Sequence, residues 1–223
     1  MFKLTALVTV REGADGGKVI DALNSAASDR VHIVRSILEP TLPNTSNGGN
    51  YIWHLQFPEE AAYRAWKEDS AGGKKADAAL GDRALVHQVD SMAYAGGRVG
   101  TKRPLDHGVY RLLVLSVNRA ASEVAVAQFD SETYEMGLYI PSILNWQLSR
   151  VVESSGARRW THVWEQEFEN LDGLLRTYML HPYHWGWINR WYDPECTEHM
   201  IDNYLCHSFC NFTGQVIAQG GSQ

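Results

Sequence analysis

The sequence has few cysteines and no long apolar run. Three cysteines in 223 residues, none of them in a CxxC pair, argue against a disulfide framework and favour a reducing, cytoplasmic location. No run of about 18 apolar residues is present, so we expect no segment to cross a membrane. The apolar start at residues 1–10 alternates in character, which predicts a strand instead of a signal peptide.

An excess of basic residues is also missing. The chain has 20 Lys and Arg against 26 Asp and Glu, a formal net charge of −6, so no basic stripe is expected to neutralise nucleic-acid phosphates. The sequence contains no GxSxG motif and no dinucleotide fingerprint. The glycine pairs at 72–73 and 96–97 fit no phosphate loop and predict turns.

Two series of elements occur in the same order. The first predicts strands at 2–10, 31–38, 51–57 and 85–94, with helices at 16–28 and after Pro58. The second predicts strands at 109–117, 144–152, 160–168 and 201–212, with helices at 121–139 and 171–180. Each series reads βαββαβ, so the sequence predicts an internal repeat.

The repeat fixes the expected fold and domains. The two series align when the first is shifted along the chain. The shift is 107 residues for the first strands, 111 residues for 51–57 onto 162–168, and 112 residues for the last strands. We expect an α+β protein with tandem ferredoxin-like repeats that form a fused dimeric α+β barrel. The predicted parts are a first repeat at 1–97, which acts as a scaffold, a linker at 98–108, and a second repeat at 109–215 with the active site.

Residues 159–212 hold five of the nine histidines and five of the eight tryptophans. Strand alternation places His162 on one face with the aromatic residues Trp160, Trp164 and Phe168. The alternative is that His162 is a core histidine whose ring is satisfied by the backbone.

Tyr178 and His184 flank a proline at which the chain must turn. Pro182 disfavours a regular helix, so the turn can bring the phenol and the imidazole together. Imidazole takes a proton near neutral pH, and a phenol can donate to a carbonyl or a developing enolate. Asp202 could hold the second imidazole nitrogen. The alternative is a core tyrosine and a loop histidine.

A metal site is the rival interpretation of this segment. His181 and His184 are three residues apart, but Pro182 interrupts any two-histidine helix motif. Cys206 and His207 are adjacent on a predicted strand and point to opposite faces. We therefore expect no metal, and we expect the cysteines to be buried thiols.

The motif Thr161-His162-Val163 with Phe168, followed by Tyr178-x-x-His181-Pro182-x-His184-x-Gly186-Trp187, resembles the stress-responsive dimeric α/β-barrel family. The resemblance implies that the family's catalytic tyrosine and histidine fall on Tyr178 and His184. Its strand histidine falls on His162 and the aspartate partner on Asp202. The family's other pocket histidine is replaced by Tyr110 or Arg111. Because members usually pair two βαββαβ units, this chain resembles a fused pair with one retained site.

The resemblance implies a cyclase-type activity that needs no metal or organic cofactor. We expect acid–base catalysis that makes or breaks a carbon–carbon bond in a bulky phenolic or polyketide-like substrate, with a lyase favoured. His184, Tyr178, Asp202 and His162 are the predicted catalytic residues; the predicted substrate-binding residues are Trp160, Trp164, His181, Trp185, Trp187 and Tyr110. The alternatives are a non-catalytic binder of small aromatic molecules, or a cofactor-free monooxygenase of this fold. A homodimer of the fused barrel is a further expectation, with no nucleic acid or membrane partner.

Overall fold

The computed structural model describes residues 1–28 and 31–217. The first repeat contains the following elements: β1 (Phe2–Val10), α1 (Gly16–Ala26), β2 (Arg35–Pro40), β3 (Tyr51–Phe57), α2 (Glu60–Glu68), α3 (Gly73–Gly81) and β4 (Val86–Ala95). The predicted strand at 31–38 begins four residues later than expected, and the second helical region consists of two helices.

The second repeat follows with β6 (His107–Leu115), α4 (Glu123–Tyr139), β7 (Asn145–Ser155), β8 (His162–Phe168), η1 (Gly173–Tyr178), η2 (Tyr183–Trp187), η3 (Ile188–Trp191) and β9 (Cys206–Thr213). The segment expected to be a linker holds a short strand, β5 (Arg98–Thr101), which pairs with β7. In place of one helix at 171–180, two π-helical segments and a 3-10 turn follow β8.

Strand pairing confirms the internal repeat. The strands are ordered β2-β3-β1-β4 in the first unit and β7-β8-β6-β9 in the second. Phe2 pairs with Phe57 and Val109 with Phe168, so the offsets of 107 and 111 residues hold in the register. The predicted offset of 112 for the last strands is wrong. Ala95 pairs with Phe2 and Asn211 with Val109, which gives an offset of 116.

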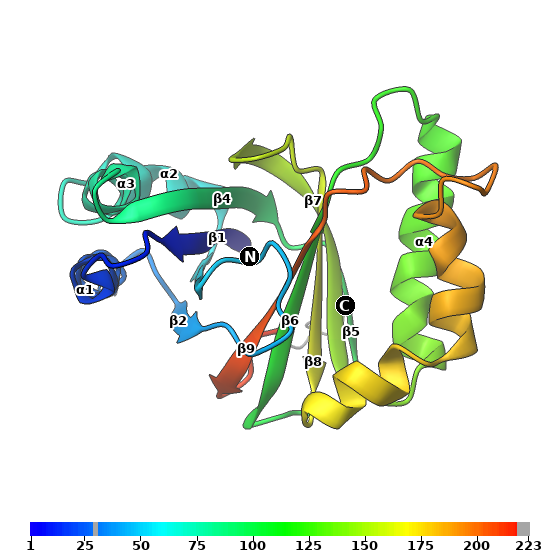
Figure 1. The fold of residues 1–223 in the computed structure, drawn as a ribbon. Helices are drawn as coiled ribbons and strands as arrows, with labels where there is room; N and C mark the ends of the chain where they lie inside the picture. Colours follow the sequence, from blue (N-terminus) through cyan, green and yellow to red (C-terminus); the bar gives the residue numbers. More distant parts are fainter. Residues whose placement is uncertain (29–30, 218–223) are drawn as a thin grey trace.

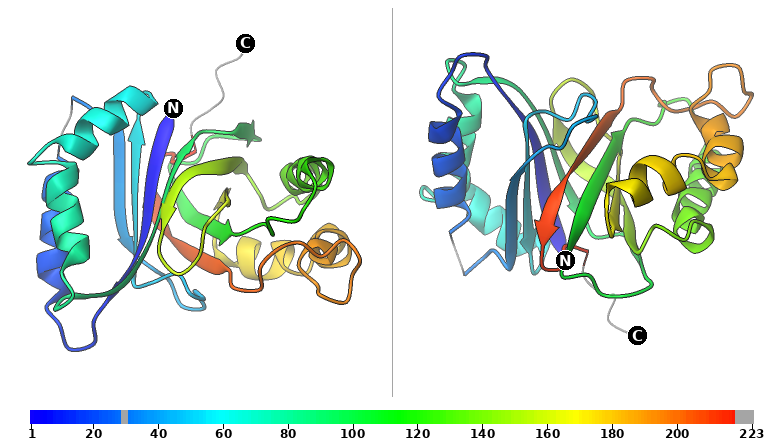
Figure 2. Two further views of the ribbon diagram at one scale, coloured as in Figure 1. Left: turned by 90° about the horizontal axis from the view of Figure 1, so that it is seen from above. Right: turned by 60° about the horizontal axis from the view of Figure 1, so that its bottom comes forward.

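The two sheets join into a nearly closed barrel. β4 continues into the second sheet through β7, where Tyr94 pairs with Val151. At the other seam, the loop after β2 reaches β9, since Ser46 bridges to His207. Figures 1 and 2 show α1, α2 and α3 on one side of the sheets, with α4 and the chain after β8 on the other. The expected fused α+β barrel is therefore confirmed.

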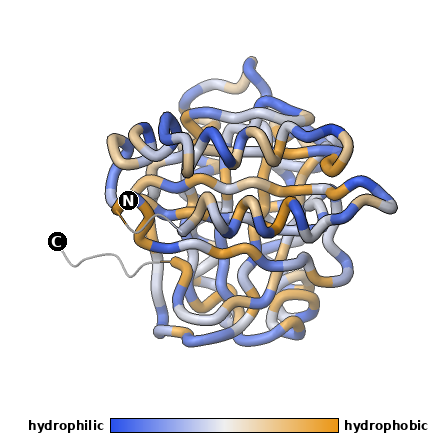
Figure 3. Tube along the Cα trace, turned by 90° about the vertical axis from the view of Figure 1, so that its left-hand side faces the viewer, coloured by the Kyte–Doolittle hydropathy of each residue, from blue (hydrophilic) through white to orange (hydrophobic). Residues whose placement is uncertain are grey.

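Apolar side chains fill three layers. One core lies between the first sheet and its helices, where α1 buries Val19 and Leu23. Figure 3 shows hydrophilic and hydrophobic residues alternating along the helices of this side, as expected for helices that cover a sheet. A second core lies between the other sheet and α4, and a third lies between the two sheets and includes Leu112 and Val163.

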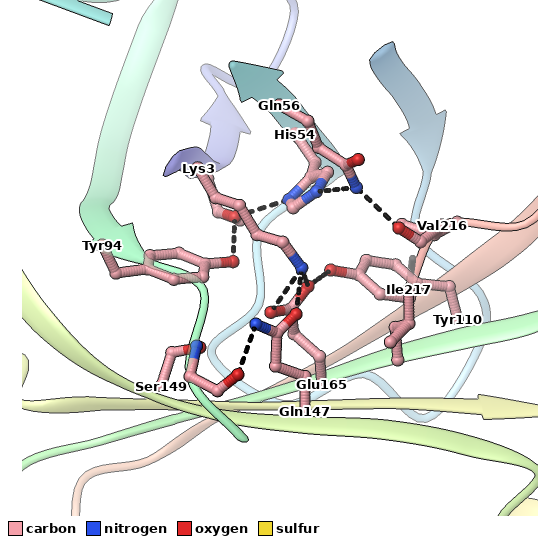
Figure 4. A network of polar contacts seen from close by, with 12 residues as sticks. Lys3, His54, Gln56, Tyr94, Tyr110, Gln147, Ser149, Glu165, Val216 and Ile217 are labelled. Atoms are coloured by element: carbon pink, nitrogen blue, oxygen red, sulfur yellow. Dashed lines mark hydrogen bonds and ion pairs between the residues drawn. The ribbon is translucent and has the colours of Figure 1, made fainter. Parts of the chain in front are cut away.

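The layer between the sheets also contains a buried polar network, which is drawn in Figure 4. Nζ of Lys3 lies 2.9 Å from Oε1 and 3.0 Å from Oε2 of Glu165, and both side chains are almost fully buried. The Tyr110 hydroxyl donates to Oε1 of Glu165 at 2.7 Å. Because Lys3 is on β1 and Glu165 on β8, this ion pair fastens one repeat to the other. No helix within the described residues is both long and apolar enough to cross a membrane.

Candidate functional site

A cavity of about 190 Å³ lies in the second repeat, between the sheet and the helical segments that cover it. The strands β6 and β9 contribute its floor, and α4 with η1, η2 and η3 contribute its walls. Its lining consists of one charged residue, five polar or aromatic residues and five apolar residues: Arg111, Leu113, Met136, Tyr178, Met179, His184, Ile188, Asn189, Tyr192, Leu205 and His207.

Tyr178 and His184 come together in this cavity, as the sequence predicted. Tyr178 is the last residue of η1 and is buried, and Pro182 directly precedes η2, which carries His184. The two rings are 4.4 Å apart between centroids and inclined by 49°. Pro182 has no N–H to extend the preceding segment, so the chain turns between the two residues. The Nδ1 atom of His184 is buried and has no hydrogen-bond partner.

Arg111 is the charged residue of the cavity, and its side chain is only 1% exposed. Its Nη1 donates to Oε1 of Gln166 and, at 3.3 Å, to the Tyr178 hydroxyl. Its Nη2 donates to Nδ1 of His207 at 3.0 Å. This bond assigns the remaining ring proton of a neutral His207 to Nε2. All of these partners are uncharged groups.

The resemblance left one pocket position to Tyr110 or Arg111, and Tyr110 was the residue included in the predicted site; His207 was not included. A signal was available, because Arg111 is a charged residue within an otherwise apolar stretch, Val109–Leu115, and a fully buried arginine is rare without a partner. For His207, strand alternation separated it from Cys206 but could not show which face pointed to the cavity.

Both cavity histidines are neutral at pH 7. Burial, followed by the charge of Arg111, lowers the pKa of His184 from 6.5 to about 4. A hydrogen bond to the Met179 backbone acts in the opposite direction. Burial and then Arg111 lower the pKa of His207 to about 3.

His162 does not line this cavity. Its ring packs edge-on against Phe129 of α4, with centroids 5.8 Å apart. Its Nδ1 lies 2.8 Å from the Thr161 hydroxyl, and its Nε2 lies 3.2 Å from Oδ1 of Asp130. It borders a separate open hollow of about 780 Å³ at the end of β8. The predicted grouping of His162 with Tyr178 and His184 is therefore not found.

Asp202 does not orient His184. The last strand begins at Cys206, so Asp202 lies in the loop before it and not on a strand that faces the cavity. Its Oδ1 accepts a hydrogen bond from the Tyr204 backbone, and its Oδ2 lies 3.5 Å from Nε of Arg158. This half-exposed carboxylate borders another surface hollow, shared with Arg159.

The predicted substrate-binding residues also lie elsewhere. Trp160 precedes β8 and packs in the core between the sheets, whereas Trp164 packs in the core beneath α4. Tyr110 faces Glu165 because it alternates with Arg111 along β6. Three further residues are in the helical segment but outside the cavity lining: the exposed Trp185 and Trp187, and the half-buried His181, whose Nδ1 accepts the Tyr183 N–H.

The first repeat has apolar or small residues where the second has the polar cavity residues. By the registers above, Arg111, Gln166 and His207 correspond to the following residues: Leu4, Leu55 and Ser91. Leu4 and Leu55 are part of the apolar core beneath the first repeat's helices. The chemistry-bearing groups thus occur in one half of the barrel.

Metal ligands do not gather within the part of the chain that the structure describes: no cluster of three His, Cys, Asp or Glu forms there. Cys206 and Cys210 are buried in the layer between the sheets, and burial raises the pKa of Cys206 to about 12. A thiol in that state is a weak nucleophile.

Comparison with solved structures identifies proteins of the same fold. An anthrone oxidase-like protein is similar over 99% of this chain and 96% of its own, with a TM-score of 0.67 and 7% identity. A candidate monooxygenase from Lactobacillus acidophilus is similar over 98% of both chains, with a TM-score of 0.56 and 12% identity. A candidate monooxygenase from Fusobacterium nucleatum has a TM-score of 0.58 at 10% identity, over 96% of this chain and 95% of its own. At these identities the likeness shows the fold alone.

Sequence comparison gives one match. No curated protein matches the chain. The family described as the stress responsive A/B barrel domain matches residues 109–204, the part that contains Tyr178, His184 and Arg111. The second repeat therefore matches the stress responsive A/B barrel domain family over residues 109–204.

Proposed function

We propose that the protein is an acid–base enzyme that works without a cofactor and makes or breaks a carbon–carbon bond in a small aromatic substrate. The observation that carries this proposal is the pairing of Tyr178 with a neutral, buried His184 in one cavity, with ring centroids 4.4 Å apart. The resemblance in sequence to a family that contains a cyclase supports the reaction class.

In the proposed mechanism, His184 takes a proton from the substrate through Nδ1, the ring nitrogen without a partner. Tyr178 donates its hydroxyl proton in a hydrogen bond to the carbonyl or phenol oxygen on which negative charge develops. Nη1 of Arg111 lies 3.3 Å from that hydroxyl, so the guanidinium favours negative charge at the same place. In a ring closure, His184 removes the proton from the carbon nucleophile and Tyr178 stabilises the oxygen that becomes negative. In a decarboxylation, the proton that His184 takes from the phenol hydroxyl is returned to the ring carbon that loses CO2.

The cavity volume narrows the substrate. An engineered apolar cavity of about 150 Å³ holds benzene, so about 190 Å³ accommodates one substituted ring. The tryptophan content of residues 159–212 suggested a bulky substrate, but none of those tryptophans lines the cavity. We therefore place a single phenolic ring in this cavity, beside the contacting rings of Tyr178 and His184.

Turnover of a panel of phenolic acids and aromatic ketones tests the assignment. With any substrate that turns over, His184→Ala is expected to lower kcat by about 10²–10⁴-fold, and Tyr178→Phe by about 10²–10³-fold. Matched controls are His87→Ala and Tyr139→Phe, which replace exposed residues outside the cavity and should leave kcat unchanged. Full activity in both cavity variants would remove the basis for this proposal.

A cofactor-free monooxygenase is the second candidate, favoured by the fold shared with the candidate monooxygenases and the anthrone oxidase-like protein. An oxygen electrode separates the two reactions, because a lyase or cyclase consumes no oxygen when substrate is added. A protein that binds such rings without any turnover would instead be a non-catalytic binder.

The proposal includes a cytoplasmic location and a homodimer of the fused barrel. Size-exclusion chromatography with light scattering tests the second statement, since the chain has a mass of 25.1 kDa.

A further inference from the structure

Arg111 carries a buried charge that no described residue neutralises. Its three hydrogen-bond partners are an amide oxygen, a phenol and an imidazole, and it forms no ion pair. Removing an arginine from water costs several kcal/mol unless a charged partner compensates. The cavity lining contains no aspartate or glutamate among the residues that the structure describes.

Carboxylates of β8 and α4 have other partners than Arg111. Glu165 and Glu167 alternate with Gln166 on β8 and face the other side of the sheet, where Glu165 binds Lys3 and Glu167 accepts from Asn145. Glu132 of α4 binds Arg190 at 2.6 Å. The guanidinium of Arg111 therefore faces the cavity without a counter-charge.

Two hydrogen-bonding edges near Arg111 stay open toward a ligand. The Nε–H of Arg111 takes part in none of its bonds, and Nη2 has a second hydrogen besides the one on His207. An Nε–H and an Nη2–H that lie side by side form a fork that matches the two oxygens of a carboxylate. A neutral His207 keeps its own proton on Nε2 and adds no negative charge.

The cavity also has an apolar surface, which includes Leu113, Met136, Ile188 and Leu205. A ligand that suits both this surface and the guanidinium has one anionic group and one apolar ring. The volume of about 190 Å³ limits it to a single ring.

We propose that this cavity binds aromatic carboxylates of one ring, with the carboxylate on the guanidinium of Arg111 and the ring against Leu113 and Ile188. The role of such an acid as a substrate rests on the proposed function, but its binding does not. Occupation supplies the missing counter-charge, so affinity depends on the negative charge of the ligand and not on its shape alone.

Isothermal titration calorimetry with benzoate and benzamide tests the proposal. The two probes have nearly the same shape and differ in charge. We expect the wild type to bind benzoate at least about 10-fold more tightly than benzamide, since hydrogen bonds to charged groups are stronger. Equal affinity for the two, or no binding of benzoate, would overturn the proposal without need of any variant.

Two substitutions of Arg111 test whether the carboxylate of benzoate binds its guanidinium. Arg111→Met is expected to weaken benzoate binding by about 10- to 100-fold and to leave benzamide binding within about 3-fold. Arg111→Lys keeps the charge but not the fork and should give an intermediate affinity. Benzoate binding that survives in Arg111→Met would show that the anion sits elsewhere.

His184→Ala separates this inference from the proposed function. It should lower kcat by about 10²–10⁴-fold yet retain benzoate binding, because His184 supplies no positive charge at pH 7. If the protein binds benzoate and benzamide equally while His184→Ala still lowers kcat, the carboxylate site is refuted and the catalytic proposal is not. If the protein prefers benzoate to benzamide but His184→Ala keeps full activity, the catalytic proposal is refuted and the carboxylate site is not.

Discussion

The ion pair between Lys3 and Glu165 provides the sharpest test of how the two repeats are held together. Both side chains are at most 1% exposed, and their atoms lie 2.9 Å apart across the layer between the sheets. Lys3→Met leaves a buried carboxylate without its cation, and breaking a buried pair in this way costs about 3–5 kcal/mol. For a chain of this length, that loss lowers Tm by roughly 6–20 °C.

The double variant Lys3→Met with Glu165→Gln removes both charges and keeps an oxygen for the Tyr110 hydroxyl. Replacing a buried ion pair by uncharged residues of similar volume is often neutral, so we expect the double variant to be within about 1 kcal/mol of the wild type. Equilibrium urea unfolding of the wild type, both single variants and the double variant gives the coupling free energy.

Two results would refute this reasoning. A loss below about 1 kcal/mol in Lys3→Met would mean that water or another group compensates Glu165. A double variant that is destabilised by the sum of the single variants would mean that the two side chains act independently.

Three further predictions concern the second repeat. Gly137→Ala would place a Cβ 2.1 Å from the Trp146 ring and should cost at least about 1–3 kcal/mol in urea unfolding. Glu132→Gln weakens the contacts that tie η3 to α4, and should cost about 1.5–3 kcal/mol and speed limited proteolysis of residues 183–200. The pKa of His184 is lower in the folded state, about 4 against 6.5, so the unfolded state binds more protons. This contribution is complete above pH 6.5, and about 3 kcal/mol is lost as pH falls through about 4. The difference in unfolding free energy between the wild type and His184→Asn, measured at pH 7 and pH 4, should change by this amount.

Each of these has its own control. Gly81→Ala adds a Cβ that meets nothing within 4 Å, so it should not destabilise; equal losses at Gly81 and Gly137 would contradict the packing argument. Unchanged proteolysis in Glu132→Gln would show that η3 is held by its apolar contacts. A pH dependence that is identical in His184→Asn would show that His184 titrates normally in the folded protein.

Much of the fold follows from local patterns. Alternation at 51–57 predicted β3 with its observed bounds, because a strand with a buried face has a strict period of two. The offsets of 107 and 111 residues were visible because they join strands whose aromatic and β-branched residues recur. The last strand was placed too early, since Ile201 and Asp202 alternate in polarity as in a strand, but only Ile201 forms an isolated bridge, to Val117.

The site could be predicted only in part. Tyr178 and His184 are close in sequence and are brought together by a local turn at Pro182, so the segment itself contains the information. Arg111 and His207 reach the same cavity from β6 and β9, which pair across about 95 residues of chain, and nothing local links them. Asp202 has a suitable spacing from His184, but the late start of β9 leaves it in a surface loop.

The sequence by itself determined two βαββαβ repeats, a tyrosine and a histidine that meet at a proline turn, and a second repeat richer in histidine and tryptophan than the first. These follow from periodicity and local chain geometry. Only the tertiary structure decided which face of each strand lines the cavity. It also showed that a buried arginine lines the cavity and that no tryptophan does. Those features depend on contacts between distant strands, where a shift of one residue moves a side chain to the opposite face of the sheet.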